Sequence, residues 1–200
     1  MTAKDISLAN PQGKASLALL DDLTQFKRYK IQQKNAPEWL ADYFTSLLVV
    51  GASFNFKPIL NKTYYLYLDN QQWKLSLIEP QIWQNCPYIY FAECCMYEDR
   101  TWSLQPINNW QDNPTLVKSI TAIKTEFVNS LNNEAPILST LPYFAMHLPY
   151  YQRLCAFALA NSLKASLQLQ LGHENSRRIN GINLFKQANQ ENLLKISNSP

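Results

Sequence analysis

The stretch of residues 63–104, TYYLYLDNQQWKLSLIEPQIWQNCPYIYFAECCMYEDRTWSL, decides the fold class of this chain. β-branched and aromatic residues are dense in it, and its apolar positions follow the two-residue period of a strand. The expected strands are residues 63–68, 73–78, 88–97 and 101–104. The polar residues 69–72 between the first two predict a hairpin with a four-residue loop. We therefore predict a four-stranded antiparallel meander.

Helical patterns flank this stretch on both sides. Apolar residues recur at helical spacing, and proline or asparagine stands near the start of several of these segments. The expected helices are residues 15–33, 37–50, 115–131 and 149–171, the last of them ending at Gly172. Residues 173–200 are polar and rich in Asn and Gln, with one weak apolar segment at residues 182–185, which predicts a partly flexible tail. The sequence thus indicates an α+β fold with one domain over residues 1–172.

Composition narrows the classes of function. The chain has 200 residues, of which 46% are hydrophobic and 16% charged, so it can bury a large core. It has only 4 glycines, and phosphate-binding loops need several close together, so we expect no such loop. The net charge is only +3, and the basic residues form no concentrated run, so we expect no strong binding of nucleic acid through phosphates. The most basic positions are Lys27, Arg28, Lys30, Lys34, Arg177 and Arg178.

The expected compartment is the cytoplasm. We find no apolar run typical of a signal peptide near the start of the sequence, and no window of ~20 apolar residues for a membrane span. The 4 cysteines have no regular spacing, so we expect free thiols rather than a disulfide framework.

The residues that could carry chemistry are scattered. The candidate nucleophiles are Cys86, Cys94, Cys95 and Cys155, and the candidate bases are His147, His173 and Glu93. No short Cys or His spacing typical of zinc is present. We therefore expect no metal, no cofactor and no catalytic residue. The alternative is an enzyme with a nonlocal site, in which Glu93 or Cys94 acts with His147 or His173.

The density of aromatic residues favours a binding function. Alternation along the first strand places Tyr65 and Tyr67 on the face opposite Tyr64, and Pro80 predicts a helical turn that folds Trp83 back over the sheet. Such side chains often anchor protein partners, although helices on both faces would cover them. We predict an adaptor that binds another protein; the proposed anchors are Tyr65, Tyr67, Trp83 and Trp102.

A third reading is stacking on single-stranded nucleic acid. It would need basic residues among the aromatic ones, because the phosphates must be neutralised. This region offers only Lys62, Lys74 and Arg100 against five acids. The sequence leaves the oligomeric state open.

Residues 64–102 resemble an uncharacterised family of small intracellular proteins. Its pattern is Tyr-x-Leu-Tyr, Ser-x-Ile-x-Pro-x-x-Trp, Cys-Pro, then Asp-x-Ser/Thr-Trp. The matching residues are Tyr64, Leu66, Tyr67, Ser76, Ile78, Pro80, Trp83, Cys86, Pro87, Asp99, Thr101 and Trp102. Asn61 and Gln84 stand where the family tends to have glycine. The family has no established activity, so the resemblance implies a strand, hairpin, turn and strand unit but no catalytic residue.

Overall fold

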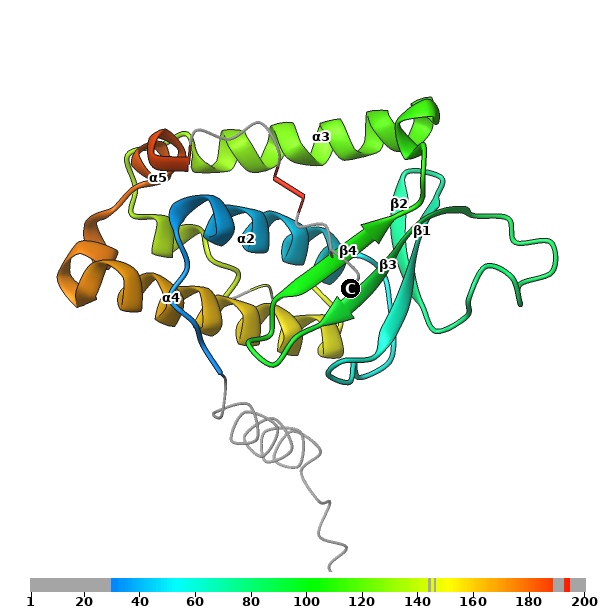
Figure 1. Ribbon diagram of the computed structural model, residues 1–200, viewed down its shortest axis with the longest axis horizontal. Helices are drawn as coiled ribbons and strands as arrows, with labels where there is room; N and C mark the ends of the chain where they lie inside the picture. Colours follow the sequence, from blue (N-terminus) through cyan, green and yellow to red (C-terminus); the bar gives the residue numbers. More distant parts are fainter. Residues whose placement is uncertain (1–29, 144, 146, 189–192, 195–200) are drawn as a thin grey trace, which may run out of the picture.

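The computed structural model describes residues 30–143, 145, 147–188, 193 and 194. The α+β class and the four-stranded antiparallel sheet are confirmed (Figure 1). The helices are α2 (Ala36–Gly51), α3 (Pro114–Leu131), α4 (Tyr150–Arg178) and α5 (Gly181–Ala188), with short 3-10 helices η1 (Trp110–Asp112) and η2 (Ile137–Thr140). The strands are β1 (Thr63–Asp69), β2 (Gln72–Ser76), β3 (Ile89–Met96) and β4 (Trp102–Pro106). Residues 15–29 of the expected helix 15–33 lie outside the described residues, and residues 30–33 are not helical.

Helix α2 is the central helix of the fold. Its start is fixed by a capping box, in which the Asn35 side chain accepts from the Glu38 backbone N–H and the Glu38 side chain accepts from the Asn35 backbone N–H. The helix contacts α3, α4 and α5 as well as strands β2 and β4 (Figure 1). The indole Nε1 of Trp39 donates to the Leu163 carbonyl of α4 at 2.9 Å. Burial of its apolar residues against these neighbours, more than helix propensity, holds α2 in place.

The strand order corrects the predicted meander. The order is β2-β1-β3-β4, so β1 lies between β2 and β3. A tight hairpin after β2 would have placed β3 beside it. Instead the long segment of residues 77–88 carries the chain back past β1, and β3 pairs with the free side of β1.

The first hairpin is also tighter than expected. Asp69 pairs with Gln72, which leaves a two-residue loop of Asn70 and Gln71 in place of the predicted four-residue loop. Both loop residues have positive φ, 44° and 75°. This is the backbone of a two-residue hairpin loop that matches the twist of its strands, although glycine would adopt it more easily than Gln71 does.

The two faces of the sheet differ in what covers them. The face that carries Tyr64, Leu66 and Leu68 joins the same buried cluster as α2. Alternation along the strands gives the opposite face, which we call the outer face. The outer face comprises Thr63, Tyr65, Tyr67, Lys74, Ser76, Tyr90, Glu93, Cys95, Ser103 and Gln105.

The described residues of the predicted tail, 173–188, 193 and 194, contribute side chains to the core. Gly172 has non-helical backbone angles (φ 76°, ψ 165°), so the long helix is interrupted where the sequence predicted its end. Beyond it, Leu184 of α5 is fully buried and Leu193 is nearly so. A Cβ on Gly181 would lie 2.3 Å from the Leu131 carbonyl oxygen, so α5 starts in direct contact with the end of α3. One weak apolar segment therefore suffices to dock this region.

Candidate functional site

The predicted anchor Tyr67 lies at the centre of an aromatic cluster on the outer face. Its ring lies 5.4 Å from those of Trp83 and Tyr90 and 6.4 Å from that of Tyr88, measured between centroids. Its hydroxyl donates to the Ile78 carbonyl at 2.8 Å. Burial, followed by the nearby Cys86, Tyr65 and Glu79 side chains, raises the pKa of Tyr67 to about 12. Tyr67 is fully buried, so it does not face a partner as predicted. Its hydrogen bond and ring contacts instead hold residues 77–88 against the sheet.

Residues 77–88 form an arm over this cluster. Pro80 lies in a β-turn closed by a hydrogen bond from Ile82 N–H to the Glu79 carbonyl, rather than in the expected helical turn. The predicted anchor Trp83 does fold back: its ring packs edge-on against Tyr67 and Tyr88, and it stays half-buried. The arm therefore has a fixed base on the outer face.

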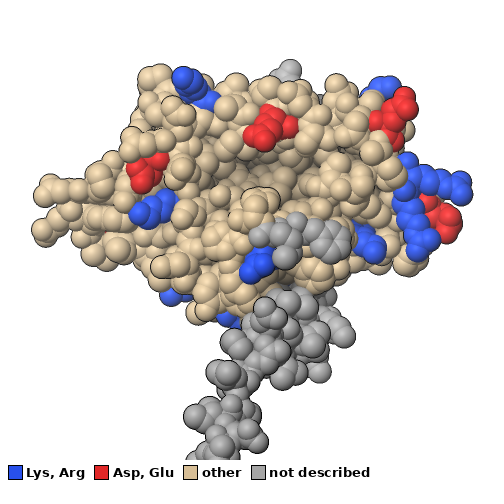
Figure 2. Space-filling view, turned by 180° about the vertical axis from the view of Figure 1, so that it is seen from behind, with Lys and Arg blue, Asp and Glu red and all other residues tan. Residues whose placement is uncertain are grey.

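Apolar side chains project from the arm into solvent. Leu77, Ile78 and Ile82 are 49%, 43% and 70% exposed. Figure 1 shows the arm extending away from the sheet. Residues 80–88 of the arm include no Lys, Arg, Asp or Glu, and the face turned to the viewer in Figure 2 shows no charged side chain at its tip. Three large apolar residues close together on one exposed segment are a feature typical of contact surfaces.

The part of the outer face around Tyr65 is open and carries the carboxylates of Glu79 and Glu93, whereas the Lys74 ammonium of the same face donates to the Tyr88 hydroxyl at 2.8 Å. Tyr65 is half-buried, its ring lies 6.3 Å from that of Tyr90, and its hydroxyl donates to a Glu79 carboxylate oxygen at 3.4 Å. Glu93, opposite Tyr65 on β3, is exposed. Burial first, and then Glu79 and Glu93, raise the pKa of Tyr65, so its phenol remains a hydrogen-bond donor at neutral pH.

A small hollow continues this open surface toward β4. It has a volume of about 130 Å³ and is lined by residues that include Glu93, Cys95, Ser103 and Gln105. Pockets for small molecules usually measure roughly 300–1,000 Å³. The hollow is therefore sized for part of a side chain rather than for a whole metabolite.

The predicted anchor Trp102 is in the wrong place for binding. It is fully buried on the face that packs against α2, where its ring lies 5.8 Å from that of Tyr64. Its backbone N–H donates to Ser46 Oγ of α2 at 2.9 Å. The reason is register: Trp102 pairs with the buried Met96, so alternation turns its side chain inward.

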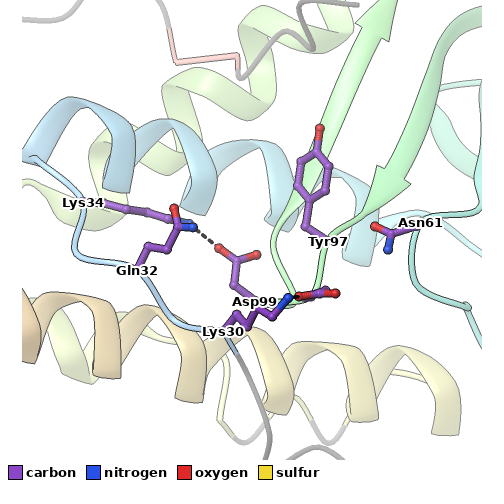
Figure 3. Close-up of a pocket in the computed structure, with 7 residues that line it drawn as sticks. Lys30, Gln32, Lys34, Asn61, Tyr97 and Asp99 are labelled. Carbon is purple, nitrogen blue, oxygen red and sulfur yellow. Dashed lines mark hydrogen bonds and ion pairs between the residues drawn. The ribbon is translucent and has the colours of Figure 1, made fainter.

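A second cavity, of about 440 Å³, lies where the chain enters α2 (Figure 3). Lys34 forms ion pairs with Asp42 of α2 and with Asp99, the latter at 2.5 Å between Nζ and Oδ2. The other oxygen of Asp99 accepts from the backbone N–H and the hydroxyl of Thr101. No local sequence pattern predicts this cluster, because Asp99 is far from Lys34 and Asp42 in the chain.

The charges of this cluster hold each other in the ionised form. Burial alone would raise the pKa of Asp99, but the Lys34 ammonium and the hydrogen bonds from Thr101 lower it below its ordinary value. Burial alone would lower the pKa of Lys34, yet the two carboxylates raise it. The cluster thus joins the β3–β4 turn to α2, which is a structural role.

The residues of the alternative enzyme site are not assembled. Burial raises the pKa of Cys94 well above its ordinary value, raises that of Cys155 to about 12, and raises that of Cys95 as well. His147 and His173 are exposed, and in the described part of the chain neither forms a hydrogen bond or ion pair with Glu93 or a cysteine. A nucleophilic thiol needs a lowered pKa and a neighbouring base.

Among the described residues, no group of three or more His, Cys, Asp or Glu side chains is placed to hold a metal ion. No helix in this described part of the chain is both long and apolar enough to cross a membrane.

Comparison with known proteins adds no relative. No family model, no curated protein and no solved structure matches this chain.

Proposed function

We propose that this protein is a non-enzymatic interaction module that binds a segment of another protein on the outer face of its sheet. One observation carries the proposal: two surfaces of different character lie side by side on the protein. One is the open, acidic surface around Tyr65, Tyr90 and Glu93, and the other is the apolar arm beside it. The partner segment should accordingly carry a Lys or Arg side chain next to apolar ones.

The acidic surface supports recognition of a cation. Glu79 and Glu93 both lie close enough to Tyr65 to raise the pKa of its phenol. A cation placed over a tyrosine ring gains about 0.5–1 kcal/mol at an exposed site, and carboxylates nearby add charge-assisted hydrogen bonds. The same carboxylates would repel phosphates, which counts against the single-stranded nucleic acid alternative.

The arm supports recognition of apolar side chains. Ile82 and Ile78 are exposed although Tyr67 and Trp83 hold the base of the arm in one position. A fixed apolar surface binds with a smaller loss of conformational entropy than a flexible one. Tyr65 stays as a proposed anchor, Trp83 positions the arm, and Tyr67 and Trp102 act only from the interior.

We propose the cytoplasm as the compartment in which this binding takes place. The four cysteines are free thiols in the structure, a state that reducing compartments maintain.

The test is recovery of a partner from the native host with tagged full-length protein at physiological salt and after nuclease treatment. The variant Tyr65→Ala/Glu93→Gln should lose a stoichiometric partner by about tenfold or more, the range of a binding hot spot. Glu134→Gln makes the same charge change at an exposed position after α3, and it should keep the partner. Equal recovery by both variants would contradict the proposal, and a partner released by nuclease would favour nucleic acid instead.

A further inference from the structure

The hollow of about 130 Å³ on the outer face owes its shape to two neighbouring rows of side chains. Each row crosses β1, β3 and β4; the long side chains of one row are Tyr65, Glu93 and Gln105, and the short side chains of the next are Thr63, Cys95 and Ser103. Because side chains on one face stand roughly perpendicular to the sheet, the short row forms the floor beside a higher wall. The register of the strands therefore makes the hollow.

Ser103 at the floor of the hollow carries a hydroxyl without a partner. The residue is 2% exposed, and it lines the hollow on the face opposite the inward-facing Trp102. No described residue forms a hydrogen bond with its hydroxyl. The hydroxyl oxygen keeps accessible surface, unlike the indole nitrogens of Trp73 and Trp102. Buried polar groups nearly always have a partner, so this hydroxyl is placed to bond with a group that enters the hollow from outside.

The rim of the hollow carries an uncompensated negative charge. Glu93 is exposed and, in contrast to Glu79, forms no hydrogen bond or ion pair with a described residue. No Lys or Arg is among the described residues that line the hollow, and Lys74 of the same face is engaged by the Tyr88 hydroxyl. The hollow therefore favours a cationic group that donates hydrogen bonds.

The depth of the hollow favours an ammonium over a guanidinium. The acceptors are the Glu93 carboxylate at the rim, the Thr63 hydroxyl and the Ser103 hydroxyl at the floor. A lysine ammonium is a compact charge on a slender, flexible stem, so it can reach the floor and still contact the rim. An arginine guanidinium is a flat fork that pairs best with a carboxylate, which would hold it at Glu93 and leave Ser103 without a partner.

We propose that this hollow binds the ammonium group of a lysine in the partner segment. The ammonium donates to Glu93, Thr63 and Ser103. Along β1, Tyr65 stands between Thr63 of the hollow and Tyr67 under the arm, so the lysine stem packs on the Tyr65 ring and its apolar neighbours lie against the arm. This inference rests on the proposed function and names its cation as lysine.

The test is a titration of ¹⁵N-labelled full-length protein with Nα-acetyl-lysine methylamide, followed by NMR. The backbone signals of Ser103 and Cys95 should shift saturably. The matching arginine compound and the Nε-acetylated lysine compound should each bind at least about threefold more weakly, since the first does not fit the floor and the second has lost its charge. Glu93→Gln should weaken binding of the lysine compound about three- to tenfold, and Ser103→Ala about two- to fivefold.

Glu134→Gln is the matched control, since it removes the same charge from an exposed position after α3. Three results would overturn the inference: no saturable shift at Ser103 or Cys95, equal binding of the lysine and arginine compounds, or equal weakening by both glutamate variants. The comparison of the compounds on the unchanged chain decides even where a variant unfolds.

The compounds contain no partner sequence, so the titration separates this inference from the proposed function. A failed titration together with a recovered partner that depends on Tyr65 overturns this inference alone. Lysine-selective binding in the hollow without any recovered partner supports this inference and contradicts the proposed function alone.

Discussion

Replacing Lys34 by methionine should destabilise the protein by about 3–5 kcal/mol, the cost of breaking a buried ion pair from one side. The substitution keeps the aliphatic volume but leaves Asp42, which is 1% exposed, and Asp99 without the ammonium that they share. The structure offers a control in Lys30→Met. Lys30 pairs with Glu98 at 2.9 Å, but their side chains are 80% and 45% exposed, so this loss should cost about 0–1 kcal/mol.

The assay is urea unfolding of both variants at pH 7, followed by tryptophan fluorescence. A midpoint for Lys34→Met that lies as close to the wild type as that of Lys30→Met would refute the reasoning. If Lys34→Met does not fold, Lys34→Met/Asp42→Asn/Asp99→Asn should recover folding, because no buried charge remains. Failure of this triple variant as well would show that the cost of Lys34→Met has another cause.

The cluster of Lys34, Asp42 and Asp99 also makes the unfolding free energy depend on pH. Because the folded pKa of Asp99 is lowered from 3.8, its contribution is present above about pH 4 and is lost as the pH falls through the folded value. The folded pKa of Lys34 is raised from 10.5, so its contribution is present below pH 10.5 and is lost as the pH rises through the folded value. The difference in unfolding free energy between wild type and Lys34→Met should therefore narrow in acid, and a constant difference from pH 7 to pH 3 would contradict the assignment.

Two further predictions concern the core. Gly181→Ala should cost at least about 1–3 kcal/mol, because its Cβ would meet the Leu131 carbonyl at 2.3 Å, whereas Gly51→Ala, with open space around its Cβ, should be neutral or slightly stabilising in the same urea assay. The thiols of Cys94 and Cys155 should react with an alkylating reagent at pH 8 only as the protein unfolds, because both are buried with raised pKa values. Fast labelling of either thiol in native protein, located by peptide mass spectrometry, would instead support the enzyme alternative.

The sequence predicted what depends on local pattern. Asn35 and Pro37 signalled the start of α2, and the period-two runs signalled β1 and β3, because caps and alternation are set by neighbouring residues. The meander was wrong because strand order depends on how a long connection packs, which no local pattern records. Likewise the apolar segment at 182–185 looked weak in the sequence, but it lies in α5, which packs against α2 and begins with Gly181 at the end of α3.

The candidate site was predicted only in part, because it too depends both on local patterns and on contacts between distant segments. Alternation correctly separated Tyr65 and Tyr67 from Tyr64, but it did not show that the arm buries Tyr67 and leaves Tyr65 open. Trp102 was wrongly predicted to be a binding residue, because the face of the sheet on which its side chain lies depends on the register of β4 with β3. The acidic neighbours Glu79 and Glu93 come from segments that only the folded chain brings to Tyr65.

The most direct test of the central claim is photo-crosslinking in the native host, with p-benzoylphenylalanine in place of Tyr65 and, as the control, in place of Leu169. Leu169 is 57% exposed on α4, so both probes reach solvent but on different elements. The account predicts that position 65 alone captures a defined protein, that the captured peptide contains Lys or Arg beside apolar residues, and that adding Glu93→Gln reduces the yield. No capture at position 65, or the same products at positions 65 and 169, would contradict it.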